Sequence, residues 1–113
     1  MTDHAWIKEF PAEITVCDGD GVVVDMNDKS AASNAADGGY ALVGQSLLGC
    51  HPEEARRKLE RLLDTQQANI YTIEKGGVKK LIYQSPWYEN GEFRGLVELE
   101  LIIPREMPHF VRD

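Results

Sequence analysis

The segment Lys79–Pro104, KKLIYQSPWYENGEFRGLVELELIIP, predicts a long two-stranded hairpin around which the rest of the chain is organised. Apolar and acidic residues alternate along its second arm, which is the pattern of a strand with one face on a core and the other in water. Asn90-Gly91 supplies the positive φ angles that a tight hairpin turn needs. We therefore expect the glutamate side chains, Glu98 and Glu100, to point outward. The apolar side chains should face the core, namely Val97, Leu99, Leu101 and Ile103.

The size and charge of the chain exclude several classes of protein. A chain of 113 residues with 42% hydrophobic residues is enough for one compact core, so we expect one domain. A net charge of −7 argues against binding to nucleic acid or to an anionic membrane surface. No apolar run approaches the roughly 20 residues of a membrane span, and the first residues do not resemble a signal peptide. We therefore expect a cytoplasmic protein.

The remaining segments predict three further strands and a set of helices. An Asp-Gly-Asp-Gly turn separates two short strands, and Asn27 suits the cap of a helix rich in small residues. An EF-hand calcium loop beginning at Asp18 would need a glutamate where Lys29 stands, so the run is interpreted as a turn. The expected order is a helix over 2–10, strands over 12–17 and 22–27, short helices, a long amphipathic helix over 52–67, a strand over 68–75 and the hairpin. This order predicts an α+β fold, a five-stranded antiparallel sheet with helices packed on one face.

The predicted boundaries divide the chain into three parts. Residues 1–11 form an N-terminal flanking helix, residues 12–104 the domain, and residues 105–113 a C-terminal tail or linker. A two-turn helix carrying Trp6 and Phe10 on one side is not stable alone, so it packs either on its own sheet or on a second copy of the protein.

The order and spacing of these features resemble a PAS domain, from about Glu9 to Ile103. The resemblance rests on the paired strands around DGDG ending in Met26-Asn27, the GQSLL segment, the long connector helix, and the meander through Asn90-Gly91. The segments GQSLLGCHPEEARRKL and GLVELELIIPREMPHF are similar to a bacterial branch of PAS sensors with a Cys-His-Pro step before the long helix.

This resemblance implies a non-catalytic sensory or signal-transduction module. Such a module encloses a small cavity, often with a ligand. It binds a small ligand, or relays signals through a homodimer or through a separate or fused output domain, or does both. Two other functions stay open: a structural dimerisation module with a filled core, and a small enzyme. The enzyme would need a carboxylate or histidine inside the pocket, and no catalytic or metal-binding residue can be assigned.

Five residues are candidates for contact with a ligand. The resemblance suggests His51, at the start of the long helix, as a haem ligand of a redox or gas sensor, although the residue also suits a plain hydrogen bond to a loop carbonyl. Cys50 is followed by His51-Pro52, whereas the reactive cysteine of flavin photoreceptors is followed by Arg-Phe-Leu, and this difference argues against flavin. The alternative for Cys50 is that it packs as a small buried apolar residue. Three aromatic residues of the sheet can line a cavity, or they can pack as ordinary members of the hydrophobic core, namely Tyr71, Tyr83 and Trp87.

Overall fold

The structure of the chain is a computed structural model that describes residues 5–50 and 52–113, with Cys50 described by its backbone alone. The helices are α1 (Ala5–Lys8), α2 (Asp28–Ser33), η1 (Ala35–Asp37), η2 (Gly39–Leu42), α3 (Leu47–Cys50) and α4 (Glu53–Thr65), of which η1 and η2 are 3-10 helices. The strands are β1 (Glu13–Asp18), β2 (Val23–Met26), β3 (Asn69–Lys75), β4 (Val78–Glu89) and β5 (Glu92–Ile103). All neighbouring strands pair antiparallel, in the order β2-β1-β5-β4-β3, which confirms the predicted α+β architecture.

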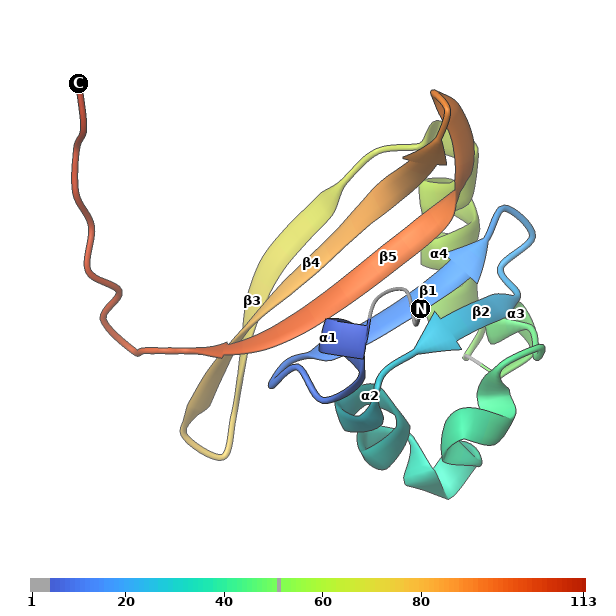
Figure 1. The fold of residues 1–113 in the computed structure, drawn as a ribbon, viewed down its shortest axis with the longest axis horizontal. Helices are drawn as coiled ribbons and strands as arrows, with labels where there is room; N and C mark the ends of the chain where they lie inside the picture. The colour runs from blue at the N-terminus through green and yellow to red at the C-terminus, as the bar shows by residue number, and fades with distance from the viewer. Residues whose placement is uncertain (1–4, 51) are drawn as a thin grey trace.

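The sheet has two faces with different cover. Helices α2, α3 and α4 pack against one face, which we call the inner face, while α1 lies against the opposite, outer face (Figure 1). After Ile103 the chain leaves the sheet and runs away from the body of the molecule in an extended path (Figure 1). The predicted hairpin is the centre of this arrangement, because β5 pairs with β1 on one side and with β4 on the other.

The face predicted for Glu98 in β5 is wrong, although its side chain is exposed as expected. Glu98 pairs with Thr15 of β1 and with Gln84 of β4, so these three side chains share one face of the sheet. The Thr15 hydroxyl is 2.5 Å from the Ser30 hydroxyl of α2, which places Glu98 on the inner face beneath the helices. Alternation along a strand fixes which residues share a face, but not which face the helices cover. The same register places Glu100 on the inner face and Leu99 on the outer face.

Two buried clusters join the inner face to its helices. The first contains Val23, Met26, Ala31 and Leu42, with Leu47 packed against it. The second contains Cys17, Leu63 and Leu96, with Leu47, Leu59, Leu62 and Phe93 packed against it. The amphipathic pattern predicted for α4 is therefore confirmed, because its leucines face the sheet while an Arg57–Glu53 pair of 2.6 Å lies on the exposed side.

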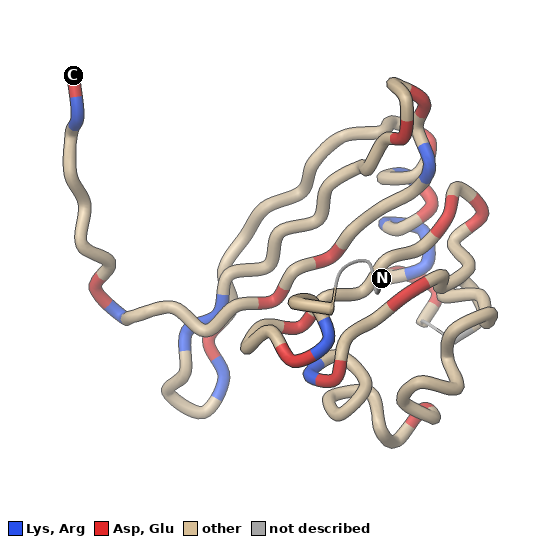
Figure 2. Tube along the Cα trace, in the orientation of Figure 1, with Lys and Arg blue, Asp and Glu red and all other residues tan. Residues whose placement is uncertain are grey.

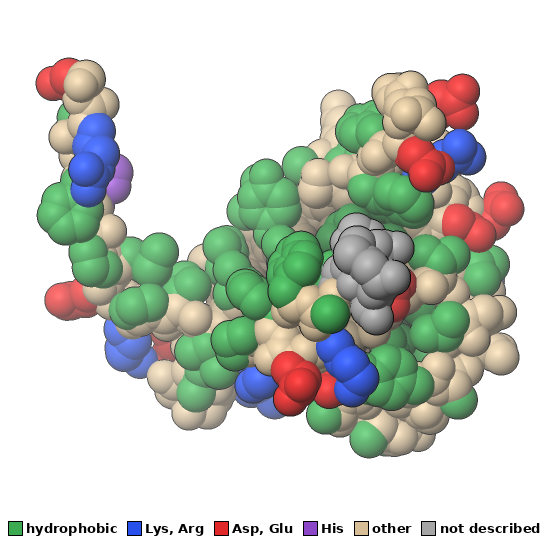
Figure 3. All heavy atoms as spheres, viewed as in Figure 1, with side chains coloured by type: hydrophobic (Ala, Val, Ile, Leu, Met, Phe, Trp, Pro, Cys, Tyr) green, Lys and Arg blue, Asp and Glu red, His purple; other side chains and the backbone are tan. Residues whose placement is uncertain are grey.

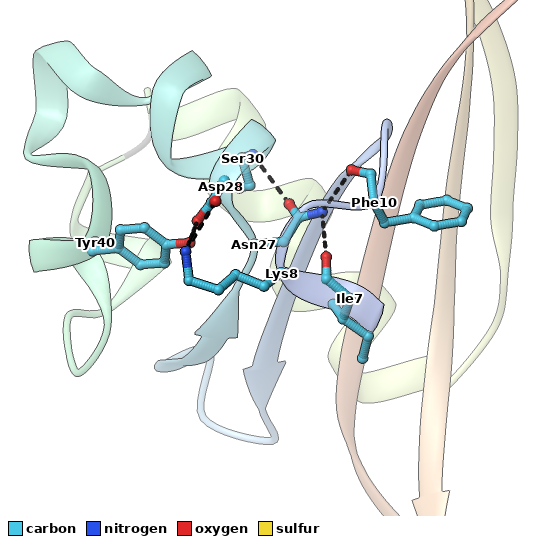
Figure 4. Close-up of polar contacts among 7 residues, drawn as sticks. All are labelled: Ile7, Lys8, Phe10, Asn27, Asp28, Ser30 and Tyr40. Atoms are coloured by element: carbon cyan, nitrogen blue, oxygen red, sulfur yellow. Dashed lines mark hydrogen bonds and ion pairs between the residues drawn. The ribbon is translucent and has the colours of Figure 1, made fainter. Parts of the chain in front are cut away.

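Asn27 joins three segments of the chain through one side chain (Figure 4). Its amide nitrogen donates to the carbonyl oxygens of Ala12 at 2.7 Å and Ile7 at 3.1 Å, and more weakly to that of Phe10 at 3.4 Å. Its amide oxygen accepts from the backbone N–H of Ile14 at 3.0 Å and of Ser30 at 3.1 Å. The residue is only 1% exposed. A buried side-chain amide therefore joins the end of α1, the start of β1 and the first turn of α2.

An exposed cluster beside Asn27 adds a second link between the same segments. The Lys8 ammonium lies 3.0 Å from the Asp28 carboxylate, to which the Tyr40 hydroxyl also donates (Figure 4). This hydrogen bond raises the pKa of Tyr40 to about 12, and together with Lys8 it lowers the pKa of Asp28. Helix α1 is thus attached to α2 by both a buried amide and a surface ion pair.

Gly95 allows β5 to approach β1 closely. Its φ of +153° lies in a region that residues with a side chain rarely adopt, and an added Cβ would be 2.0 Å from the carbonyl oxygen of Cys17. The Trp87 indole N–H donates to the same carbonyl at 3.0 Å. The close pairing of β5 with β1 therefore requires glycine at this position.

Acidic residues gather at one end of the sheet. Figure 2 shows them at the β1–β2 turn and the neighbouring β4–β5 turn, where Asp18, Asp20 and Glu89 surround an open surface hollow with one basic neighbour, Arg94. Among the described residues, no group of three or more acidic, histidine or cysteine side chains is arranged to hold a metal ion. None of the helices described has the length and apolar character needed to cross a membrane.

Replacing Gly95 by alanine should destabilise the fold strongly. The methyl group meets backbone atoms rather than a flexible side chain, so β5 must move away from β1; we expect a loss of at least about 2 kcal/mol in the free energy of unfolding. Urea denaturation measures this loss, with Gly44→Ala as the control, since Gly44 also has a positive φ but no atoms within 4 Å of the added methyl. Equal losses in the two variants would show that only backbone conformation matters.

Substitutions of Asn27 can test the donor and the acceptor of its amide group separately. Asn27→Asp keeps an oxygen that accepts from Ser30 but replaces the donors with a charge facing backbone carbonyls, and we expect it to lower the free energy of unfolding by about 2–4 kcal/mol. Hydrogen exchange should then show α1 exposed while the Ser30 amide stays protected. Asn27→Ala should lose protection at both places. If both variants unfold within about 0.5 kcal/mol of the native protein, Asn27 does not hold these segments together.

Candidate functional site

A cavity of about 110 Å³ lies between the inner face of the sheet and the helices. Strands β1, β2, β4 and β5 form its floor, and the segment from α2 to α4 forms its roof. The lining residues fall into an apolar set and a polar set. The apolar set is Cys17, Met26, Leu42, Leu47, Leu59, Leu96 and Val97, and the polar set is Thr15, Asn34, Gln84 and Glu98.

The polar floor of the cavity belongs to one row of side chains across the sheet. Cross-strand pairing places Thr15, Glu98, Gln84 and Asn69 side by side on β1, β5, β4 and β3. The Asn69 amide donates to the Gln84 carbonyl oxygen at 2.7 Å, and the Gln84 amide donates to Glu98 Oε2 at 2.6 Å. These charge-assisted and neutral hydrogen bonds fix the orientation of each amide.

The apolar wall of the cavity includes a cysteine that does not behave as a nucleophile. Cys17 is 2% exposed, and burial raises the pKa of its thiol. A raised pKa keeps the thiol protonated, whereas nucleophilic cysteines need the thiolate. Cys17 therefore contributes a small apolar surface to the cavity.

A second row on the inner face holds two carboxyl groups side by side. Glu13 of β1 pairs directly with Glu100 of β5, and Lys80 approaches Glu13 at 4.0 Å. Burial raises the pKa of Glu13 to about 7, and the neighbouring Glu100 adds to the rise, while Ser33 and Lys80 oppose it. At neutral pH this pair holds a proton part of the time, because two adjacent carboxylates repel each other.

The three aromatic residues named from the sequence lie on different sides of the sheet. Tyr71 is on the inner face, in the row of Glu100, where the Lys58 ammonium of α4 lies 4.7 Å from its ring centroid. Tyr83 pairs with Leu99, so it is on the outer face and is 38% exposed. Trp87 borders the acidic surface hollow at the end of the sheet. The structure does not bring these three residues together at the cavity.

His51 lies outside the described residues, as does the side chain of Cys50, so their proposed contacts with a ligand stay predictions. The size of the cavity bears on the haem hypothesis by itself. An engineered cavity of about 150 Å³ holds benzene, and a haem macrocycle is several times larger than benzene. The cavity of this structure does not accommodate haem between the sheet and the helices as they stand.

The sequence prediction missed the four polar residues that line the cavity. Gln84 and Glu98 occupy positions of the predicted hairpin, but Glu98 was expected to point into water, and the stretch that ends at Gln84 does not alternate cleanly. Thr15 and Asn34 are isolated polar residues in segments rich in apolar or small residues. A polar residue on each of three neighbouring strands, at positions that the register makes adjacent, is the signal that could have identified the row.

Replacing Glu13 by glutamine should reduce the dependence of stability on pH. The folded protein holds the Glu13 proton more tightly than the unfolded chain, in which the pKa of this carboxyl is near 4.5. The stability contributed by this group therefore falls as pH rises from about 4.5 to about 7, and it stays low at higher pH. Glu13→Gln should therefore be more stable than the native protein above the folded pKa, by about 1 kcal/mol. Urea midpoints measured across this pH range test the difference. The exposed tail variant Glu106→Gln is the control, and identical pH profiles in all three proteins would contradict the assignment.

No protein-family model matches the chain, and no curated protein sequence matches it. Solved structures do resemble it. A sensory box sensor histidine kinase from Vibrio cholerae has a TM-score of 0.64 at 14% identity, covering 88% of this chain and 87% of that one. The PAS domain of BvgS from Bordetella pertussis has a TM-score of 0.62 at 19% identity, covering 88% and 82%. VqmA bound to DPO has a TM-score of 0.64 at 12% identity, covering 88% of this chain and 56% of that one.

These similarities extend over most of the chain. They agree with the antiparallel strand order and with the α+β architecture predicted from the sequence. The chain therefore has the PAS fold.

Proposed function

We propose that this chain is a non-catalytic sensory module that binds a small ligand in the inner-face cavity and passes the change to an associated signalling partner. The observation that carries the proposal is the cavity itself, which combines apolar walls with a polar row oriented by hydrogen bonds. Small-molecule sites have this composition, with few polar groups to fix orientation and apolar surface to supply affinity. The similar structures include sensor kinases and a ligand-bound protein, which supports the same role here.

A route from the cavity to α1 supports the signalling part of the proposal. Thr15 lines the cavity and contacts Ser30, whose backbone N–H is held by Asn27. Asn27 in turn binds the end of α1. A ligand that moves Thr15 would alter the first turn of α2 and, through Asn27, the attachment of α1. This route consists of contacts between packed groups and requires no large displacement.

The outer face supports association with a second copy of the chain. Trp6 on α1 is 66% exposed, and Phe10, which follows α1, is 41% exposed. Ile70 and Tyr83 are exposed on the sheet. Figure 3 shows apolar side chains gathered over the outer face of β3, β4 and β5. A contiguous apolar patch on a protein of this size marks an interaction surface. We place a homodimer interface here, beside the helix that the Asn27 route reaches.

Native mass spectrometry tests the proposal. Protein purified gently from its expression host should show an extra mass that disappears on denaturation, and a complex of two chains. In Leu59→Phe, which fills the cavity from α4, the extra mass should be lost while the dimer remains. Val111→Phe, in the exposed tail, is the control and should keep both. Retention of the ligand by Leu59→Phe would place the site elsewhere. A ligand-binding function would be contradicted if the native protein showed only its own mass and no small molecule of a fragment library raised its unfolding temperature.

A further inference from the structure

We propose that the cavity selects a small organic cation, a protonated amine on a short apolar body, held by Glu98 and Asn34. This inference rests on the proposed function, because it names the chemical class of the ligand for the same site. It follows from three properties of the lining: which hydrogen-bonding groups are already used, which charges are present, and how much space remains.

The polar groups that line the cavity are partly used within the protein. The Asn34 amide nitrogen donates to the Ser30 carbonyl at 2.9 Å, and the Gln84 amide nitrogen donates to Glu98 Oε2 at 2.6 Å. The Thr15 hydroxyl is paired with the Ser30 hydroxyl. In contrast, none of the hydrogen bonds among described residues involves Asn34 Oδ1 or Glu98 Oε1. The Asn34 and Gln84 amides each keep one further N–H, but the one unused acceptor that carries a charge is Glu98 Oε1, which a positively charged donor satisfies best.

The charge of the lining favours a cation. Glu98 is the one carboxylate among the lining residues, and no lysine, arginine or described histidine lines the cavity. The cavity lies in a protein with a net charge of −7, so its surroundings also attract positive charge. An anionic ligand would be repelled by Glu98, and a hydrogen bond from an ammonium to this carboxylate is stronger than one from a neutral donor.

The space and the walls limit the rest of the ligand. The cavity of about 110 Å³ is smaller than the cavity of about 150 Å³ that accommodates benzene. Opposite the polar row lie Leu42, Leu47 and Leu59, which offer apolar surface and no hydrogen bond from their side chains. Glu98 is exposed, so the polar end of the cavity opens toward solvent. These properties fit a short alkyl group placed under the helices with its charged nitrogen at the Glu98 end.

Three probes with nearly the same body and different charge test the inference: n-butylammonium, 1-butanol and butyrate. Each is titrated into the full chain while backbone amide NMR shifts are followed. We expect n-butylammonium to shift the amides around Glu98 and Gln84 and to bind at least about tenfold more tightly than butyrate or butanol. Equal or tighter binding of butanol or butyrate would overturn the inference, as would shifts confined to residues away from the cavity, or no binding by any probe.

Two variants assign the effect to the carboxylate. Glu98→Gln keeps an oxygen that accepts from Gln84 but removes the charge, and it should weaken n-butylammonium binding by about tenfold while leaving butanol unaffected. Glu106→Gln makes the same change of net charge in the exposed tail and should bind as the native protein does. Unchanged affinity in Glu98→Gln would overturn the role of this residue.

The result is separable from the test of the proposed function. A neutral or anionic ligand released from the native protein, but absent from Leu59→Phe, would leave the sensory function intact and overturn the cation class. A ligand retained by Leu59→Phe would instead contradict the cavity as the binding site, whatever its charge.

Discussion

The buried amide of Asn27 is the interaction on which the arrangement of this protein depends. Both of its polar atoms are used within the chain, and the residue has almost no contact with solvent. Because an unpaired buried polar group is costly, none of the segments that it joins can move away alone without leaving such a group behind. The position of α2 over the inner face, and with it the roof of the cavity, follows from this constraint.

Each face of the sheet carries both polar and apolar groups. The helix-covered face carries Glu98, Gln84 and Asn69, whereas the outer face carries Leu99 and Tyr83. Polar groups on the inner face are tolerated because they bind one another and because Glu98 is exposed to solvent. An apolar outer face is tolerated if it is itself an interface. The proposed ligand site and the proposed interface between chains thus lie on opposite sides of one sheet.

The sequence predicts the strands and helices well because their signals are local. The Asn90-Gly91 turn, the alternation along β5 and the apolar stripe of α4 each lie within one short segment. The face on which Glu98 points could not be predicted, because it depends on partners in β1, β4 and α2. For the same reason the cavity residues were missed, while Tyr71 and Tyr83, which looked alike in the sequence, lie on opposite faces. The role suggested for His51 remains a prediction.

The central position of β5 has a consequence for how such a chain can diverge. Beyond Val97, odd-numbered residues such as Leu99 lie on the outer face, and even-numbered residues such as Glu98 lie on the inner face. Inserting or deleting a single residue in this strand would exchange the two sets along everything that follows it. Changes in length are therefore confined to the turn at Asn90-Gly91 and to the segment after Ile103. Within β5, a lineage can acquire a new ligand preference only by substitution, one side chain at a time.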